Sequence, residues 1–74
     1  MPIPIHYLFY KLENAKAHVN IAGDYLGNYA KNSEIYVGEA KDNAGLEMQG
    51  CELHVNIAGD YLGDRAKNSR IYAE

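Results

Sequence analysis

The hydrophobic positions of the chain recur in columns when the sequence is written in rows of 18 residues. The two clearest columns lie two residues apart: Ala17, Ile35, Leu53 and Ile71, and then Val19, Val37, Val55 and Ala73. Alternation with a period of two is typical of a β-strand that has one buried face. The pattern therefore predicts one strand in each row. The residues between the two columns are predicted to point outward: His18, Tyr36, His54 and Tyr72.

Two more columns lie in the other half of each row. They consist of Leu8, Leu26, Ala44 and Leu62, and of Leu12, Ala30, Met48 and Ala66. In the last three rows a large side chain pairs with a small one, as in Leu26 with Ala30 and Ala44 with Met48. A close-packed interior requires such compensation of size. Residues that tolerate a positive φ mark two predicted corners of each row: Gly27, Gly45 and Gly63, and then Asn14, Asn32, Gly50 and Asn68.

The chain also contains an internal duplication. Residues 18–36 read HVNIAGDYLGNYAKNSEIY and residues 54–72 read HVNIAGDYLGDRAKNSRIY, so only three of nineteen positions differ. The copies are 36 residues apart, and the segment between them aligns with both at half that offset. We therefore expect an all-β fold with a single domain over residues 1–74: a short parallel β-helix, or β-solenoid, of four coils. The expected coils are 3–20, 21–38, 39–56 and 57–74, stacked about 4.8 Å apart.

A small α+β repeat fold is the alternative. Ala22, Leu26 and Ala30 share the i, i+4, i+8 spacing of a helix stripe, and Asp24 could cap such a helix. Gly27 inside the stretch weakens this interpretation.

The composition restricts the cellular location and the functions that are expected for the chain. The chain has 74 residues, a formal net charge of −3 and one cysteine, so it cannot be stapled by an intrachain disulfide. The mild acidity argues against nucleic-acid binding, and no apolar run is long enough for a membrane span. We expect a soluble, cytoplasmic domain.

The repeat resembles a known family. The segment from Gly38 to Val55 reads GEAKDNAGLEMQGCELHV and is similar to one unit of the Gly-rich repeat in the C-terminal domain of the glutamate synthase large subunit. The same repeat occurs in formylmethanofuran dehydrogenase. The resemblance implies a right-handed parallel β-helix that acts as a structural and interface element, with no catalytic residues to transfer. Residues 30–33 and 66–69 depart from the family pattern, and the first coil lacks it.

Three stacked carboxylates are a candidate cation site. Asp24, Asp42 and Asp60 share a column headed by His6, and a hard cation such as Ca²⁺ would relieve their repulsion. The competing and favoured interpretation is that each aspartate caps its own turn through an Asx-type hydrogen bond.

The outward column of alternating histidine and tyrosine is a candidate contact surface. His18 and His54 lie two coils apart, too far for one tetrahedral Zn²⁺. Seven tyrosines and no tryptophan also suggest an interface. Cys51 shares a column with small residues and is expected to be a structural thiol.

The two ends of the array suggest an assembly role. Pro2, Pro4 and the segment 7–10 are expected to cap the first coil, whereas the repeat still runs at Ile71 and Tyr72. We therefore expect a non-catalytic structural module that forms a homo-oligomer or docks on a partner subunit. The predicted contacts are the last coil (Ile71, Tyr72) or the outer face (His18, Tyr36, His54). A module that binds a divalent cation or small ligand is the alternative, and neither an enzyme activity nor a cofactor is expected.

Overall fold

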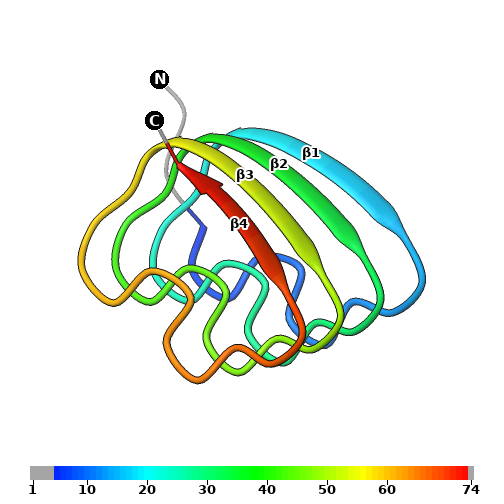
Figure 1. Cartoon of the computed structure of the whole chain (residues 1–74). Helices are drawn as coiled ribbons and strands as arrows, with labels where there is room; N and C mark the ends of the chain where they lie inside the picture. Colours follow the sequence, from blue (N-terminus) through cyan, green and yellow to red (C-terminus); the bar gives the residue numbers. More distant parts are fainter. Residues whose placement is uncertain (1–4, 74) are drawn as a thin grey trace.

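A computed structural model describes residues 5–73, which form an all-β parallel solenoid of about three turns (Figure 1). The four strands are β1 (Lys16–Ile21), β2 (Glu34–Glu39), β3 (Glu52–Ile57) and β4 (Arg70–Ala73). They make one parallel sheet in the order β1-β2-β3-β4, and paired residues are always 18 positions apart. The predicted fold class and the predicted repeat length are confirmed. Pro2 and Pro4, the residues expected to blunt the first edge, lie outside the described residues.

The core lies between the inner face of the sheet and the turns that close each coil. Its largest buried members, Leu26, Ile35, Met48, Leu53 and Val55, come from the four predicted columns, and Ala22, Ala40 and Cys51 are buried from other positions. The equivalent residues of the outermost coils, such as Leu8 and Leu62, are only partly buried against this core. The two middle coils therefore provide most of the buried apolar surface.

The turn segment opposite the sheet has an unusual backbone. Every second residue has a positive φ, as at Tyr25 (64°), Gly27 (68°) and Tyr29 (61°). Such a conformation costs a residue with a Cβ atom about 1–2 kcal/mol, which glycine avoids. Hydrogen bonds between coils oppose this cost: the Tyr25 N–H donates to the Asp42 carbonyl, and the Gly27 N–H donates in the opposite direction, to Leu8. The residues of both predicted corners also have a positive φ, as expected: Gly27, Gly45 and Gly63, and then Asn14, Asn32, Gly50 and Asn68.

The helix alternative is wrong, since the described part of the chain contains no helix. Ala22, Leu26 and Ala30 are fully buried, as a helix stripe would be, but they point into the core from the turn segment. Alternating positive and negative φ values can bring residues four apart to the same side, which imitates helical spacing. No helix in residues 5–73 is long and apolar enough to cross a membrane.

The first coil continues the solenoid although it lacks the glycines. The Tyr7 N–H donates to the Asp24 carbonyl, and the Ile5 carbonyl accepts from the Gly23 N–H. Phe9 takes the place of Gly27 in this coil and adopts a φ of 62°. Backbone pairing with the second coil therefore holds the first coil in the same path.

Candidate functional site: the outer sheet face and the turn surface

The outward residues of the sheet form a continuous stack of rings. His18, Tyr36, His54 and Tyr72 are neighbours in the strand register, and we call them the ring ladder. Successive ring centroids lie 4.7, 4.4 and 4.6 Å apart, with interplanar angles of 11° to 14°. Each stacked pair contributes about 0.5–1.5 kcal/mol beyond its buried area. The strand spacing itself sets the ring spacing, so the ladder is already ordered by the fold.

Polar partners fix the middle of the ring ladder. The Tyr36 hydroxyl donates a hydrogen bond to Glu34 Oε2 at 3.1 Å. This bond, together with partial desolvation and the negative charge of Glu34, raises the pKa of Tyr36. The Lys16 ammonium lies 5.4 Å from the centroid of the Tyr36 ring and 3.8 Å from Glu34 Oε2. The tyrosine hydroxyl is therefore held in place by Glu34.

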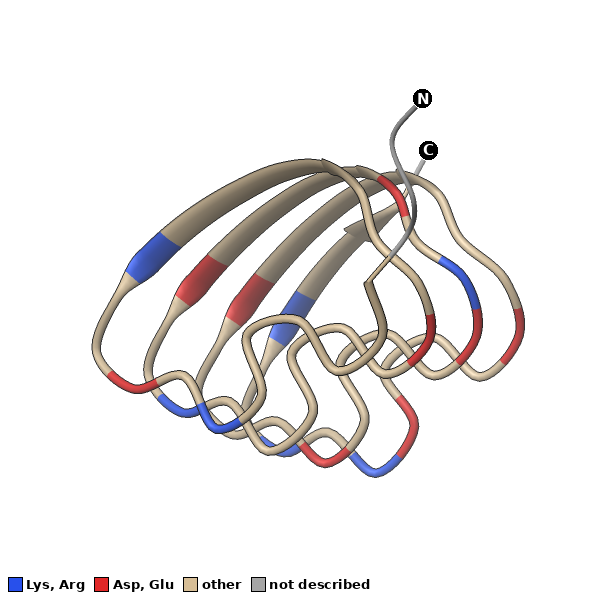
Figure 2. Ribbon diagram, turned by 180° about the vertical axis from the view of Figure 1, so that it is seen from behind, with Lys and Arg blue, Asp and Glu red and all other residues tan. Residues whose placement is uncertain are grey.

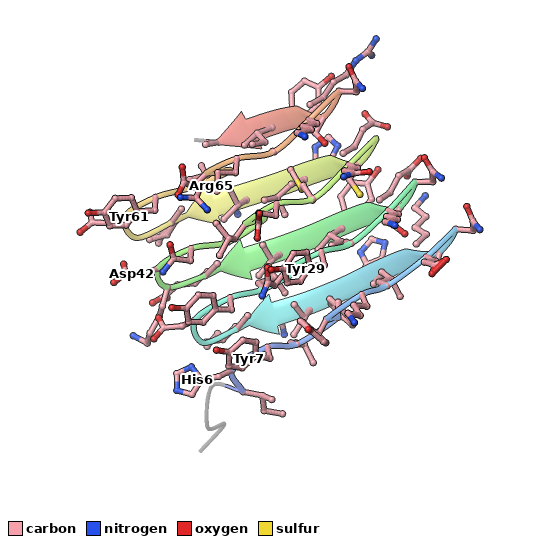
Figure 3. The ribbon with its side chains drawn as sticks, turned by 90° about the horizontal axis from the view of Figure 1, so that it is seen from below. His6, Tyr7, Tyr29, Asp42, Tyr61 and Arg65 are labelled. Carbon is pink, nitrogen blue, oxygen red and sulfur yellow. The ribbon has the colours of Figure 1, made fainter. Side chains whose placement is uncertain are left out.

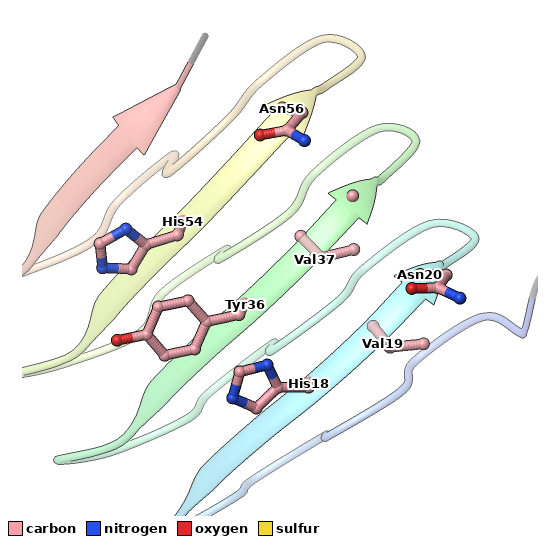
Figure 4. Close-up of a pocket in the computed structure, with 8 residues that line it drawn as sticks. His18, Val19, Asn20, Tyr36, Val37, His54 and Asn56 are labelled. Carbon is pink, nitrogen blue, oxygen red and sulfur yellow. The ribbon is translucent and has the colours of Figure 1, made fainter.

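A shallow hollow of about 280 Å³ lies beside the ring ladder (Figure 4). Asn20 and Asn56 flank it, and Gly38 lies between them in the same column. A Cβ atom on Gly38 would come within 2.8 Å of the Asn20 carbonyl oxygen, so close approach of the chains requires glycine here. The hollow is thus a depression in the sheet surface, with the amide groups of Asn20 and Asn56 on its two sides.

A row of charges borders the ring ladder at the start of the strands. Figure 2 shows one basic, two acidic and one basic residue in strand order: Lys16, Glu34, Glu52 and Arg70. The two like charges in the middle are each flanked by an opposite charge in the neighbouring strand. This row gives the outer face a charged edge that is basic at both ends and acidic in the middle.

The aspartate column is a chain of hydrogen bonds between coils. Asp24 Oδ1 accepts the backbone N–H of Asp42 at 3.1 Å, and Asp42 Oδ1 accepts that of Asp60 at 2.8 Å. His6 Nδ1 accepts the N–H of Asp24 at the head of the column. The expected Asx-type cap is therefore wrong for Asp24 and Asp42, because each of these carboxylates reaches the next coil instead. Within residues 5–73, no group of three or more histidine, cysteine, aspartate or glutamate side chains is placed to hold a metal ion.

A tyrosine cluster on the turn surface was not predicted from the sequence. Tyr7 stacks on Tyr25 at 4.7 Å, and Tyr10 makes edge contacts with Tyr7 at 6.0 Å and with Tyr29 at 5.9 Å. Figure 3 labels Tyr7 and Tyr29 on this surface. One signal could have found it: Tyr29 is one of the three positions at which the two copies differ, with Arg65 as its counterpart.

The remaining candidates occupy different environments. Cys51 is buried, and its thiol donates to the Gln49 carbonyl at 3.3 Å. Ile71 packs partly buried against the core, whereas Tyr72 is 46 % exposed as the last ring of the ladder. The geometry therefore unites His18, Tyr36, His54 and Tyr72 on one surface and leaves the aspartates on another.

Comparison of the chain with models of known protein families, with curated proteins and with solved structures finds no match.

Proposed function

We propose that the chain is a non-catalytic assembly module that docks a second copy or a partner subunit through the ring ladder. The stacked rings carry the proposal because they are ordered before any partner arrives. Association loses affinity when flexible side chains must be immobilised, and a pre-ordered surface avoids that cost. Tyrosine is also enriched at interfaces, where its ring supplies contact area and its hydroxyl a hydrogen bond.

The orientation of the rings favours a protein partner over a stacked ligand. The faces of Tyr36 and His54 are covered by neighbouring rings at 4.4 to 4.7 Å, so their edges are left for contact. The hollow at Gly38 could receive one side chain of a partner, and Asn20 and Asn56 could hydrogen-bond it. The charge row from Lys16 to Arg70 would favour a partner surface with acidic groups opposite the two ends of the row and basic groups opposite its middle.

The surface of the last coil supports the same role. Leu62, Ala66 and Ile71 are partly buried, whereas their counterparts Leu26, Ala30 and Ile35 are fully buried under the next coil. Among the described strands, β4 pairs with β3 alone. A partner that supplies a strand and small apolar side chains would pair with β4 and bury these residues, as the third coil buries their counterparts in the second coil.

We further propose that the chain is a member of the Gly-rich repeat type found in glutamate synthase and formylmethanofuran dehydrogenase, with a right-handed winding. The positive φ values at Gly27, Gly45 and Gly63 support this proposal. The strong preference for right-handed crossovers between parallel strands supports the winding. A scaffold role without catalytic residues follows from the same resemblance.

Light scattering after size exclusion tests the assembly role. We expect a discrete oligomer whose population increases as the protein concentration is raised about hundredfold. His18→Ser and Tyr72→Ser remove the two ends of the ring ladder without touching the core, and each should shift the protein toward monomer. Tyr61→Ser is the matched control, because Tyr61 is 69 % exposed and lies outside the ladder. A wild-type protein that remains monomeric at every concentration contradicts self-association. Equal effects of Tyr72→Ser and Tyr61→Ser contradict the assignment of the surface.

A further inference from the structure

The turn surface carries an open pocket between the first two coils, away from the ring ladder. Its lining consists of Tyr10, Lys11, Glu13, Tyr29 and Lys31, and its volume is about 560 Å³. Sites for small molecules usually have about 300–1,000 Å³ and combine apolar walls with a few polar groups. The volume of the pocket lies within this range, and its lining combines two aromatic side chains with three charged ones.

Two tyrosine rings form the apolar walls. The centroids of Tyr10 and Tyr29 are 5.9 Å apart and their planes meet at 78°, so the rings make a corner. The two residues are 45 % and 42 % exposed, which leaves part of each ring open to a ligand. A flat or six-membered ring can lie against one tyrosine and meet the other with its edge.

The charged groups of the pocket favour an anionic ligand. The Lys11 ammonium lies 5.4 Å from the centroid of the Tyr10 ring, and Lys31 lines the same pocket. Neither ammonium lies within ion-pair distance of a carboxylate in the described part of the chain. Glu13 contributes one negative charge against these two positive charges, so the lining itself is net positive, while the Glu47 carboxylate lies beside it and raises the pKa of Tyr29. A carboxylate held between the ammonium groups would gain charge-assisted hydrogen bonds.

The duplicated segment provides an internal comparison. Lys67 occupies the place of Lys31 in the last coil, but Arg65 replaces Tyr29 and Leu46 stands two coils after Tyr10. The equivalent surface of the last two coils therefore keeps the counterpart of Lys31 but lacks both rings, and Glu47 stands in the place of Lys11. Figure 3 labels Tyr29 and its counterpart Arg65, which form one of the three pairs that differ between the copies.

We propose that this pocket binds a small ring compound that carries a carboxylate. The ring packs in the corner made by Tyr10 and Tyr29, and the carboxylate lies against Lys11 and Lys31. Two sources supply this chemistry, uronic acid sugars and aromatic acids, and the probes of the test distinguish them.

The test follows the backbone amide signals of the ¹⁵N-labelled chain by NMR. Galacturonate and 4-hydroxybenzoate are the probes, and galactose and 4-hydroxybenzyl alcohol are their uncharged counterparts. We expect saturable shifts confined to residues 10–13 and 29–31, with the uncharged compounds at least about tenfold weaker. Binding of galacturonate alone identifies a sugar acid, and binding of 4-hydroxybenzoate alone identifies an aromatic acid. No saturable shift with either acid, or equal shifts with the uncharged compounds, overturns the proposal.

Two pairs of variants assign the site. Tyr29→Arg introduces the residue that is native at position 65, so the fold should persist while binding is lost. Lys31→Gln should weaken binding about tenfold, whereas Lys67→Gln, at the equivalent position without the rings, should leave it unchanged. Equal losses in the two lysine variants would show that the acids respond to net charge alone and would refute the pocket.

Discussion

The size compensation between Ala44 and Met48 gives the sharpest test of how this core is built. Both residues are buried in the third coil, at 1 % and 0 % exposure. In the coils on either side the large residue comes first, as in Leu26 with Ala30. If the two columns share one interior space, exchanging large and small within the third coil should preserve the filled volume.

Truncation of the large residue sets the scale. Met48→Ala removes three side-chain heavy atoms from a fully buried site, which typically costs about 2–5 kcal/mol. Domains are stable by about 0.05–0.15 kcal/mol per residue, which gives about 4–11 kcal/mol for this chain. Ala44→Leu alone overpacks the coil and should cost about 1–3 kcal/mol. The double variant Ala44→Leu/Met48→Ala should be more stable than Met48→Ala by at least about 1 kcal/mol.

Urea unfolding followed by far-ultraviolet circular dichroism measures these differences. The two single variants are the controls for the double variant, and unchanged m-values show that the extent of unfolding is the same. Additive losses, with the double variant less stable than either single variant, would refute the shared interior space. The alternation of large and small residues would then have no role in packing.

Three further predictions concern the polar groups. The pKa of Tyr36 is raised in the folded chain, so the stability that its bond to Glu34 contributes is complete below the unfolded pKa near 10 and is lost as the pH rises through the folded pKa. Glu34→Gln should lower the folded pKa of Tyr36, as measured by ultraviolet titration of tyrosinate. The Asp42 carboxylate accepts the N–H of Asp60, so Asp42→Ala should lower the Tm and Ca²⁺ should leave the Tm of the wild-type chain unchanged. An increase of the Tm with Ca²⁺ would instead support a cation site at the aspartates. Asn28 Oδ1 is buried without a hydrogen-bond partner in the described part of the chain, so Asn28→Leu should raise the free energy of unfolding by about 1–2 kcal/mol. A lower free energy of unfolding for this variant, measured by urea unfolding, would contradict the prediction.

The sequence was sufficient to predict the fold because stacking repeats the same constraint in every coil. A residue such as Ile35 has Ala17 and Leu53 as neighbours in the register, so the same preference appears several times in one chain. The ring ladder was predictable for the same reason, since His18 and Tyr36 occupy equivalent outward positions. Position along the chain and position in space are related here by one number, the 18-residue offset.

Two features were not predictable because they depend on contacts between coils. The Asp24 side chain has a donor in its own turn and another in the next coil, and only the path of the backbone selects the second. The contact of Tyr10 with Tyr29 joins positions that do not share a column, so a column pattern does not reveal it. The bulky residues at positive φ, Tyr25 and Phe9 among them, were equally hidden, because propensity alone assigns that conformation to glycine.

Comparison of the two copies distinguishes the residues that the fold requires from those that are particular to one surface. Residues that hold the coils together, such as Leu26 and Leu62, are identical in the two copies, and their difference in burial follows from their place in the stack. The differences fall at the surface row of charges, at the tyrosine pocket and at the buried Asn28. Since Tyr29 and Arg65 both occupy a positive φ, the backbone accepts either residue, and the choice of tyrosine beside Tyr10 has to be explained by what that surface contacts. The same reasoning applies to Glu34 and Arg70, which place opposite charges at equivalent ends of two strands and so give the outer face a pattern of charges that the coil repeat alone would not create.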